Sequence, residues 1–106
     1  SAEAAVTILR HLAADHPTFL DSLSIAGKDG TLRKRLTAHR GRVRAKTGTL
    51  AGVVTLAGYI LDADGTPAVA MAVFCNDVRG GNGEARQLID ALIAEWIDAS
   101  ESRSSP

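Results

Sequence analysis

The 106-residue sequence has one cysteine, few aromatic residues and no long apolar run. Because Cys75 is alone, no disulfide can form within the chain, and its position at the end of the apolar run 69–75 predicts a buried core thiol. A membrane-spanning helix needs about 20 consecutive apolar residues, which no stretch supplies. No signal peptide is recognisable at Ser1.

Acidic residues are absent from residues 31–61, although the formal net charge of the whole chain is zero. The basic residues of that stretch are Arg33, Lys34, Arg35, Arg40, Arg42, Arg44 and Lys46. Two interpretations are open: a positive field that suits an anionic ligand, or a solvated basic face that acids elsewhere in the fold neutralise. The zero net charge argues against a generic nucleic-acid or membrane-surface binder, and residues 33–46 contain no Phe, Trp or Tyr on which bases could stack.

The histidines give no indication of a metal site. His11, His16 and His39 lack the spacing of metal ligands and have no cysteine or carboxylate arranged with them. We therefore predict no metal and no cofactor.

The first forty residues favour short helices. Ala5, Leu9 and their neighbours repeat at helical spacing, so residues 2–16 are predicted to form an amphipathic helix that Pro17 stops. Residues 18–23 are expected to form another short helical turn, followed by a loop over 26–30. Asp29 is expected to cap a short segment over 31–36, because its carboxylate can accept from the free N–H groups at a helix start.

Three strands and a helix are predicted next, which gives an α/β chain of the α+β type. The strands are 41–49, 53–61 and 68–74, and the last two are apolar enough to predict cover on both faces. The links 50–52 and 63–66 are too short for a helical crossover, so the three strands should pair antiparallel. Apolar residues at helical spacing then predict a helix that ends near Asp98, with a flexible tail over 100–106. One helix at each end of the chain should flank the sheet.

The run Lys46-Thr47-Gly48-Thr49 at the end of the first strand is the most specific pattern in the chain. A lone lysine at a strand end usually only protects an edge, and a Thr-Gly-Thr run is often a hairpin approach. Here, however, the sequence Gly-Lys-Asp-Gly-Thr-Leu precedes it over 27–32, and a glycine-bearing apolar strand follows. With these flanks the chain resembles the C-terminal part of penicillin-binding proteins of the D-alanyl-D-alanine carboxypeptidase/endopeptidase family.

The resemblance implies a role for each residue of this run. Lys46 and Thr49 would be catalytic, and Thr47, Gly48 and Thr49 would bind substrate. Lys46 would set a positive charge beside the substrate carboxylate, and the Thr47 hydroxyl would contact that carboxylate. Gly48 would let the substrate backbone lie against the strand, and the Thr49 N–H would point to the developing oxyanion. Arg44 should point the same way as Lys46, either to add positive potential or to serve the fold.

The Ser-x-x-Lys and Ser-x-Asn motifs of that family are missing. Ser24 and Lys28 are one residue too far apart for the first. The resemblance therefore implies that residues 1–99 are the C-terminal portion of a larger β-lactamase/transpeptidase-like domain whose catalytic serine lies in a missing N-terminal portion. It also implies an extracytoplasmic location and a peptidoglycan stem peptide or β-lactam as ligand. The alternatives are a fragment of a β-lactamase or esterase of the same fold, or a non-enzymatic domain that binds an anion or nucleic acid.

Overall fold

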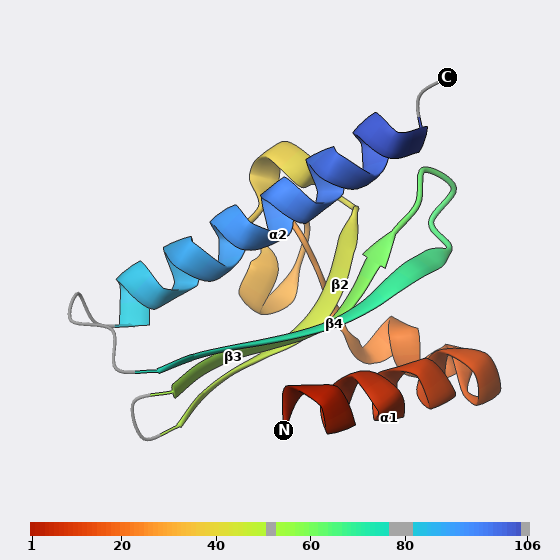
Figure 1. The fold of residues 1–106 in the computed structure, drawn as a ribbon, viewed down its shortest axis with the longest axis horizontal. Helices are drawn as coiled ribbons and strands as arrows, with labels where there is room; N and C mark the ends of the chain where they lie inside the picture. The colour runs from red at the N-terminus through yellow and green to blue at the C-terminus, as the bar shows by residue number, and fades with distance from the viewer. Residues whose placement is uncertain (51–52, 77–81, 105–106) are drawn as a thin grey trace.

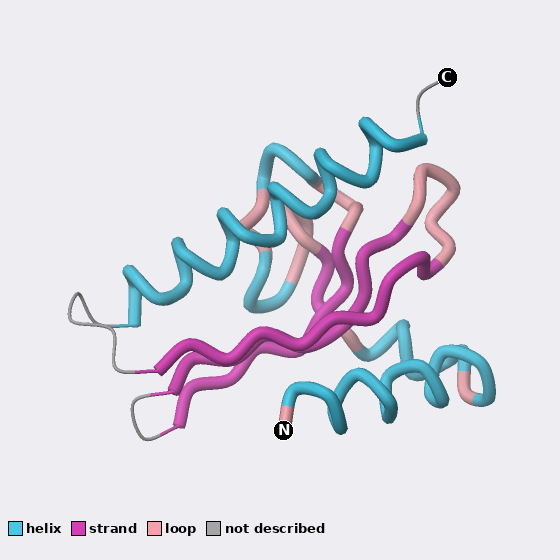
Figure 2. Tube along the Cα trace, viewed as in Figure 1, coloured by secondary structure: helices cyan, strands magenta, loops and turns pink. Residues whose placement is uncertain are grey.

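The computed structural model describes residues 1–50, 53–76 and 82–104, which form a four-stranded sheet between two long helices (Figure 1). The α-helices and strands are α1 (Ala2–Asp15), β1 (Ser24–Ile25), β2 (Val43–Leu50), β3 (Val53–Leu61), β4 (Pro67–Asn76) and α2 (Asn82–Ser104). Short 3₁₀ helices cover Pro17–Ser22 (η1), Gly30–Leu32 (η2) and Thr37–His39 (η3). The predicted α+β class is confirmed, and Figure 2 shows how the strands stay together in one layer.

The sheet has four strands in the order β1-β2-β3-β4, all antiparallel, where the sequence predicted three. The missed strand is β1, in which Ser24 pairs with Ala45 and Ile25 pairs with Arg44. Two residues are too few to show an alternating pattern, so only the tertiary pairing reveals the strand. The three predicted strands and both hairpin connections are otherwise present, although residues 51–52 of the first link lie outside the described part.

Each face of the sheet packs against one helix. On one face, the side chains at alternate strand positions contact a row of α2 side chains that recur every four residues. That row is Ala85, Ile89, Ile93 and Ile97, and it packs on Val43, Ala45, Val54, Leu56, Ile60 and Met71. On the other face Leu9 of α1 packs with Tyr59 and Leu61 of β3. β3 is therefore covered on both sides, as its apolar sequence predicts.

Two apolar segments are more open than the sequence suggested. β4 forms an edge of the sheet, so Val69 and Phe74 are exposed, and Cys75 is half-buried rather than fully buried. On α2, a second apolar row beside the buried one is exposed, with Leu88 and Trp96 among its members. The hydrophobic stripe seen in the sequence is thus wider than the surface the sheet can cover.

Three of the seven basic residues of the stretch over 31–61, together with His39, pair with acids from distant parts of the chain. Four pairs join it to these acids: Arg35–Asp90, His39–Asp98, Arg42–Glu101 and Arg44–Asp21. Three of the four acids lie on α2, which runs to Ser104, well past the end predicted near Asp98. Of these acids, Glu101 lies in the turns beyond Asp98. The second interpretation of the basic stretch, an acid-neutralised face, therefore describes Arg35, Arg42 and Arg44.

Two local predictions about side chains had different outcomes. Arg44 serves the fold, because its Nη1 donates to the Leu20 carbonyl oxygen at 2.7 Å and lies 3.6 Å from Asp21. Asp29 precedes η2 but makes no capping hydrogen bond there; its Oδ1 accepts from the Ile25 N–H at 2.8 Å instead. The carboxylate thus closes the loop between β1 and η2 rather than capping the helix.

Candidate functional site

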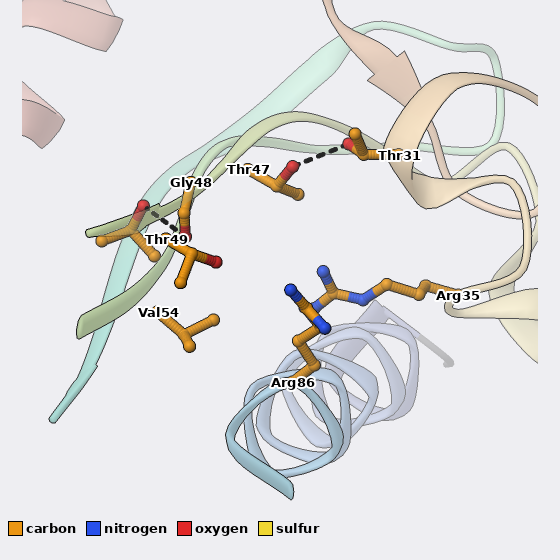
Figure 3. Close-up of a pocket in the computed structure, with 8 residues that line it drawn as sticks. Thr31, Arg35, Thr47, Gly48, Thr49, Val54 and Arg86 are labelled. Carbon is orange, nitrogen blue, oxygen red and sulfur yellow. Dashed lines mark hydrogen bonds between the residues drawn. The ribbon is translucent and has the colours of Figure 1, made fainter. Parts of the chain in front are cut away.

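A pocket of about 440 Å³ lies between the end of β2 and the start of α2. Its lining residues are Thr31, Arg35, Thr47, Gly48, Thr49, Val54, Thr55 and Arg86 (Figure 3). Three of these residues, Thr47, Gly48 and Thr49, are the substrate-binding residues that the sequence predicted. The tertiary structure thus places Thr47, Gly48 and Thr49 in the wall of a polar pocket.

The strand edge beside this pocket has no strand partner among the described residues. β1 pairs with β2 only at Arg44 and Ala45, so residues 46–50 are paired with β3 alone. The Val43 carbonyl oxygen accepts from the Ala26 N–H on the β1 side. Since backbone groups alternate between the two edges of a strand, the N–H and C=O groups of Thr47 and Thr49 point toward the open edge. This edge offers backbone donors and acceptors to an extended ligand.

Side chains of the run alternate between the two faces of the sheet. Thr47 and Thr49 lie on the α2 face, opposite Leu56 and Val54 in β3. Lys46 lies on the α1 face, is exposed and is not among the residues that line the pocket. Lys46, which was predicted to be catalytic, therefore directly precedes the lining residues in the sequence, but its side chain leaves the strand on the opposite face.

A chain of hydroxyl groups supports the pocket wall. The Thr47 hydroxyl donates to Thr31 Oγ1 at 2.7 Å, and the Thr31 N–H donates to Ser24 Oγ at 3.2 Å. Gly30 has a positive φ of 58°, and a Cβ there would lie only 2.2 Å from Ser24 Oγ. The Asp-Gly-Thr turn therefore brings Thr31 onto the strand run, a contact that the sequence analysis did not predict.

Two arginines form the wall of the pocket opposite the strand. Arg35 follows η2, and its Nε and Nη2 donate to the two oxygens of Asp90 on α2, at 3.0 and 2.7 Å. Arg86 is exposed on the first turns of α2, and no hydrogen bond or ion pair joins it to another described residue. Figure 3 shows both guanidinium groups reaching toward the space below Thr47 and Thr49. Arg86 could not be found from the sequence, because one basic residue on a mixed helix gives no periodic signal.

The described residues give no sign of a metal centre or of a membrane span. Among residues 1–50, 53–76 and 82–104, no group of three or more His, Cys, Asp or Glu side chains is placed to hold a metal ion. No helix in the same residues is both long and apolar enough to cross a membrane. The polar side chains that line the pocket are four threonines and two arginines.

Comparison with known proteins places this chain in a family. No curated protein matches it. The model of the D-Ala-D-Ala carboxypeptidase 3 (S13) family does match, over residues 1–99, which is nearly the whole chain. The chain, with its Lys-Thr-Gly-Thr strand and open edge, therefore belongs to the D-Ala-D-Ala carboxypeptidase 3 (S13) family.

Proposed function

We propose that the open edge of β2 binds the D-Ala-D-Ala end of a peptidoglycan stem peptide, which a serine from outside this chain attacks. The observation that carries the proposal is the unpaired edge over residues 46–50 directly beside a polar pocket. The family is one of peptidases, so the overall reaction is hydrolysis. Both carboxypeptidase and endopeptidase cleavage, as well as acylation by β-lactams, fit this arrangement.

The substrate adds to the edge of β2 as a short extra strand. The serine oxygen attacks the carbonyl carbon of the penultimate D-alanine, and the serine proton passes to the departing amine as the peptide C–N bond breaks. Water then hydrolyses the resulting ester. The Thr49 N–H points to the open edge and donates to the carbonyl oxygen as negative charge develops on it.

The remaining residues of the run position the substrate. Gly48 has no side chain, so the peptide backbone can lie close to the strand. Thr49 presents its hydroxyl on the pocket side, where it meets the terminal carboxylate, and Thr47, whose hydroxyl donates to Thr31, lines the wall beside it. Lys46 approaches from the opposite face, and its flexible four-carbon stem lets the ammonium group reach the reacting groups and relay a proton. Assembled peptidoglycan lies outside the cytoplasm, so the proposed reaction on its stem peptides takes place at an extracytoplasmic location.

The test removes the Thr49 N–H without disturbing the sheet. Thr49→Pro deletes that donor, and proline is tolerated at a strand edge where its missing N–H would face solvent. Loss of one oxyanion donor costs on the order of 3 kcal/mol, or about 10²-fold in rate. We expect the rate of penicillin acylation of the whole enzyme to fall by about that factor. Thr49→Val is the matched control, because it keeps the N–H and removes only the hydroxyl.

Two results would contradict the proposal. The first is an acylation rate for Thr49→Pro equal to that of Thr49→Val, which would mean that no oxyanion forms at this edge. The second is a covalent penicillin adduct on the isolated 106-residue chain, seen by intact mass, because it would place the nucleophile within this sequence. We expect the isolated chain to remain unmodified.

A further inference from the structure

The pocket beside β2 has an excess of positive charge. None of the described residues that line it is acidic, whereas two of them are arginines. Asp90 neutralises Arg35 with both of its carboxylate oxygens. Arg86 has no such partner among the described residues. The uncompensated charge in this wall of the pocket therefore belongs to Arg86.

The hydrogen-bond donors available in the pocket point to the same residue. Thr47 already gives its hydroxyl proton to Thr31. The Thr49 hydroxyl has no hydrogen-bond partner among the described residues, so it remains free to donate. A carboxylate that enters the pocket has two oxygens to satisfy. The free donors on its walls are the Thr49 hydroxyl on the strand, the Arg86 guanidinium on the helix and Nη1 of Arg35, whose charge Asp90 already balances.

We infer that Arg86 binds the terminal carboxylate of the substrate across the pocket from Thr49, and so makes the site selective for peptides with a free C-terminus. The inference rests on the proposed function, and it adds a residue from α2 to a site otherwise built on β2. A guanidinium suits this role because its planar fork can donate two parallel hydrogen bonds to one carboxylate. Asp90 neutralises the charge of Arg35, so Arg86 is the arginine of this pocket that has no carboxylate partner among the described residues.

The experiment is an NMR titration of the 106-residue chain with three probes: N-acetyl-D-alanyl-D-alanine, its C-terminal amide, and acetate. We expect the acid to shift the Arg86 Nε–H and the Thr49 amide, and to bind about tenfold more tightly than the amide. Arg86→Gln should weaken binding of the acid about tenfold and leave binding of the amide unchanged. Arg86→Lys should restore part of the loss, because it keeps the charge but not the fork.

The matched control is Arg10→Gln, which removes the same charge from an exposed arginine of α1, on the other face of the sheet. It should bind the acid as the unmodified chain does. Equal binding of the acid to Arg86→Gln and to the unmodified chain would overturn the inference while leaving the strand edge as a peptide site. Acetate that shifts Arg86 while neither dipeptide binds would keep the anion site and overturn the proposed function. No shift at Arg86 with any probe would overturn the inference.

Discussion

Gly58 allows β3 to lie close to β2 beside the candidate site, because it has a hydrogen atom where any other residue has a Cβ. It lies in β3 opposite Ala45 of β2, one residue before the Lys-Thr-Gly-Thr run. A Cβ at this position would lie 2.2 Å from the Arg44 carbonyl oxygen, 2.5 Å from the Ala45 Cα and 2.7 Å from its Cβ. Two of these atoms are backbone, so no rotation of a side chain can make room.

The cost of Gly58→Ala follows from this geometry. Ordinary contacts begin at 3.4 Å, so the two strands must separate by more than 1 Å at this point. Overpacking of a close-packed core costs about 1–3 kcal/mol, and a clash against backbone on a central strand falls at the upper end. For a chain of about this size each kcal/mol lowers Tm by about 4–8 °C, so we expect a loss of at least about 12 °C.

The measurement is thermal unfolding followed by circular dichroism, with urea unfolding as the second readout. Gly83→Ala is the matched control, because a Cβ there meets nothing within 4 Å and the position is helical. It should be neutral or should stabilise the chain by up to about 1 kcal/mol. If Gly58→Ala melted within about 2 °C of the unmodified chain, the close approach of β2 to β3 would be wrong, and with it the placement of the site.

Asp90→Asn should destabilise the chain by about 1–3 kcal/mol in urea unfolding, because it breaks the double contact to Arg35, whose side chain is only 14% exposed. Glu95→Gln, an exposed change on the same helix, should stay within about 0.5 kcal/mol, and equal effects of the two would argue against the pair. Tyr59→Phe should cost about 1 kcal/mol, because the buried hydroxyl donates to the Leu9 carbonyl oxygen at 2.6 Å. Burial raises the pKa of Tyr59 above its usual 10.0, so its contribution to stability is complete below pH 10 and falls as pH rises through the raised value. The phenylalanine variant should lack this alkaline loss, and an unchanged loss would assign the titration to another group.

The sequence predicted those elements whose apolar pattern is long enough to read. Residues 53–61 are nearly all apolar, and β3 is covered on both faces as expected. The C-terminal helix was also expected, but not its extent to Ser104, because the last turns are polar and carry no apolar pattern. β1 was missed because a two-residue strand exists only through its partner.

The candidate site divides in the same way. Thr47, Gly48 and Thr49 could be found from the sequence, because they are consecutive and their spacing with a preceding lysine is a recognisable pattern. Thr31 and Arg86 could not be found in this way. Thr31 lies 16 residues before Thr47, Arg86 lies 40 residues after Lys46, and only the fold brings them to one pocket. The local sequence thus determined which residues form the strand beside the pocket. The tertiary structure decided which charges face it, because pairing between distant side chains is set by packing and leaves no periodic trace along the chain.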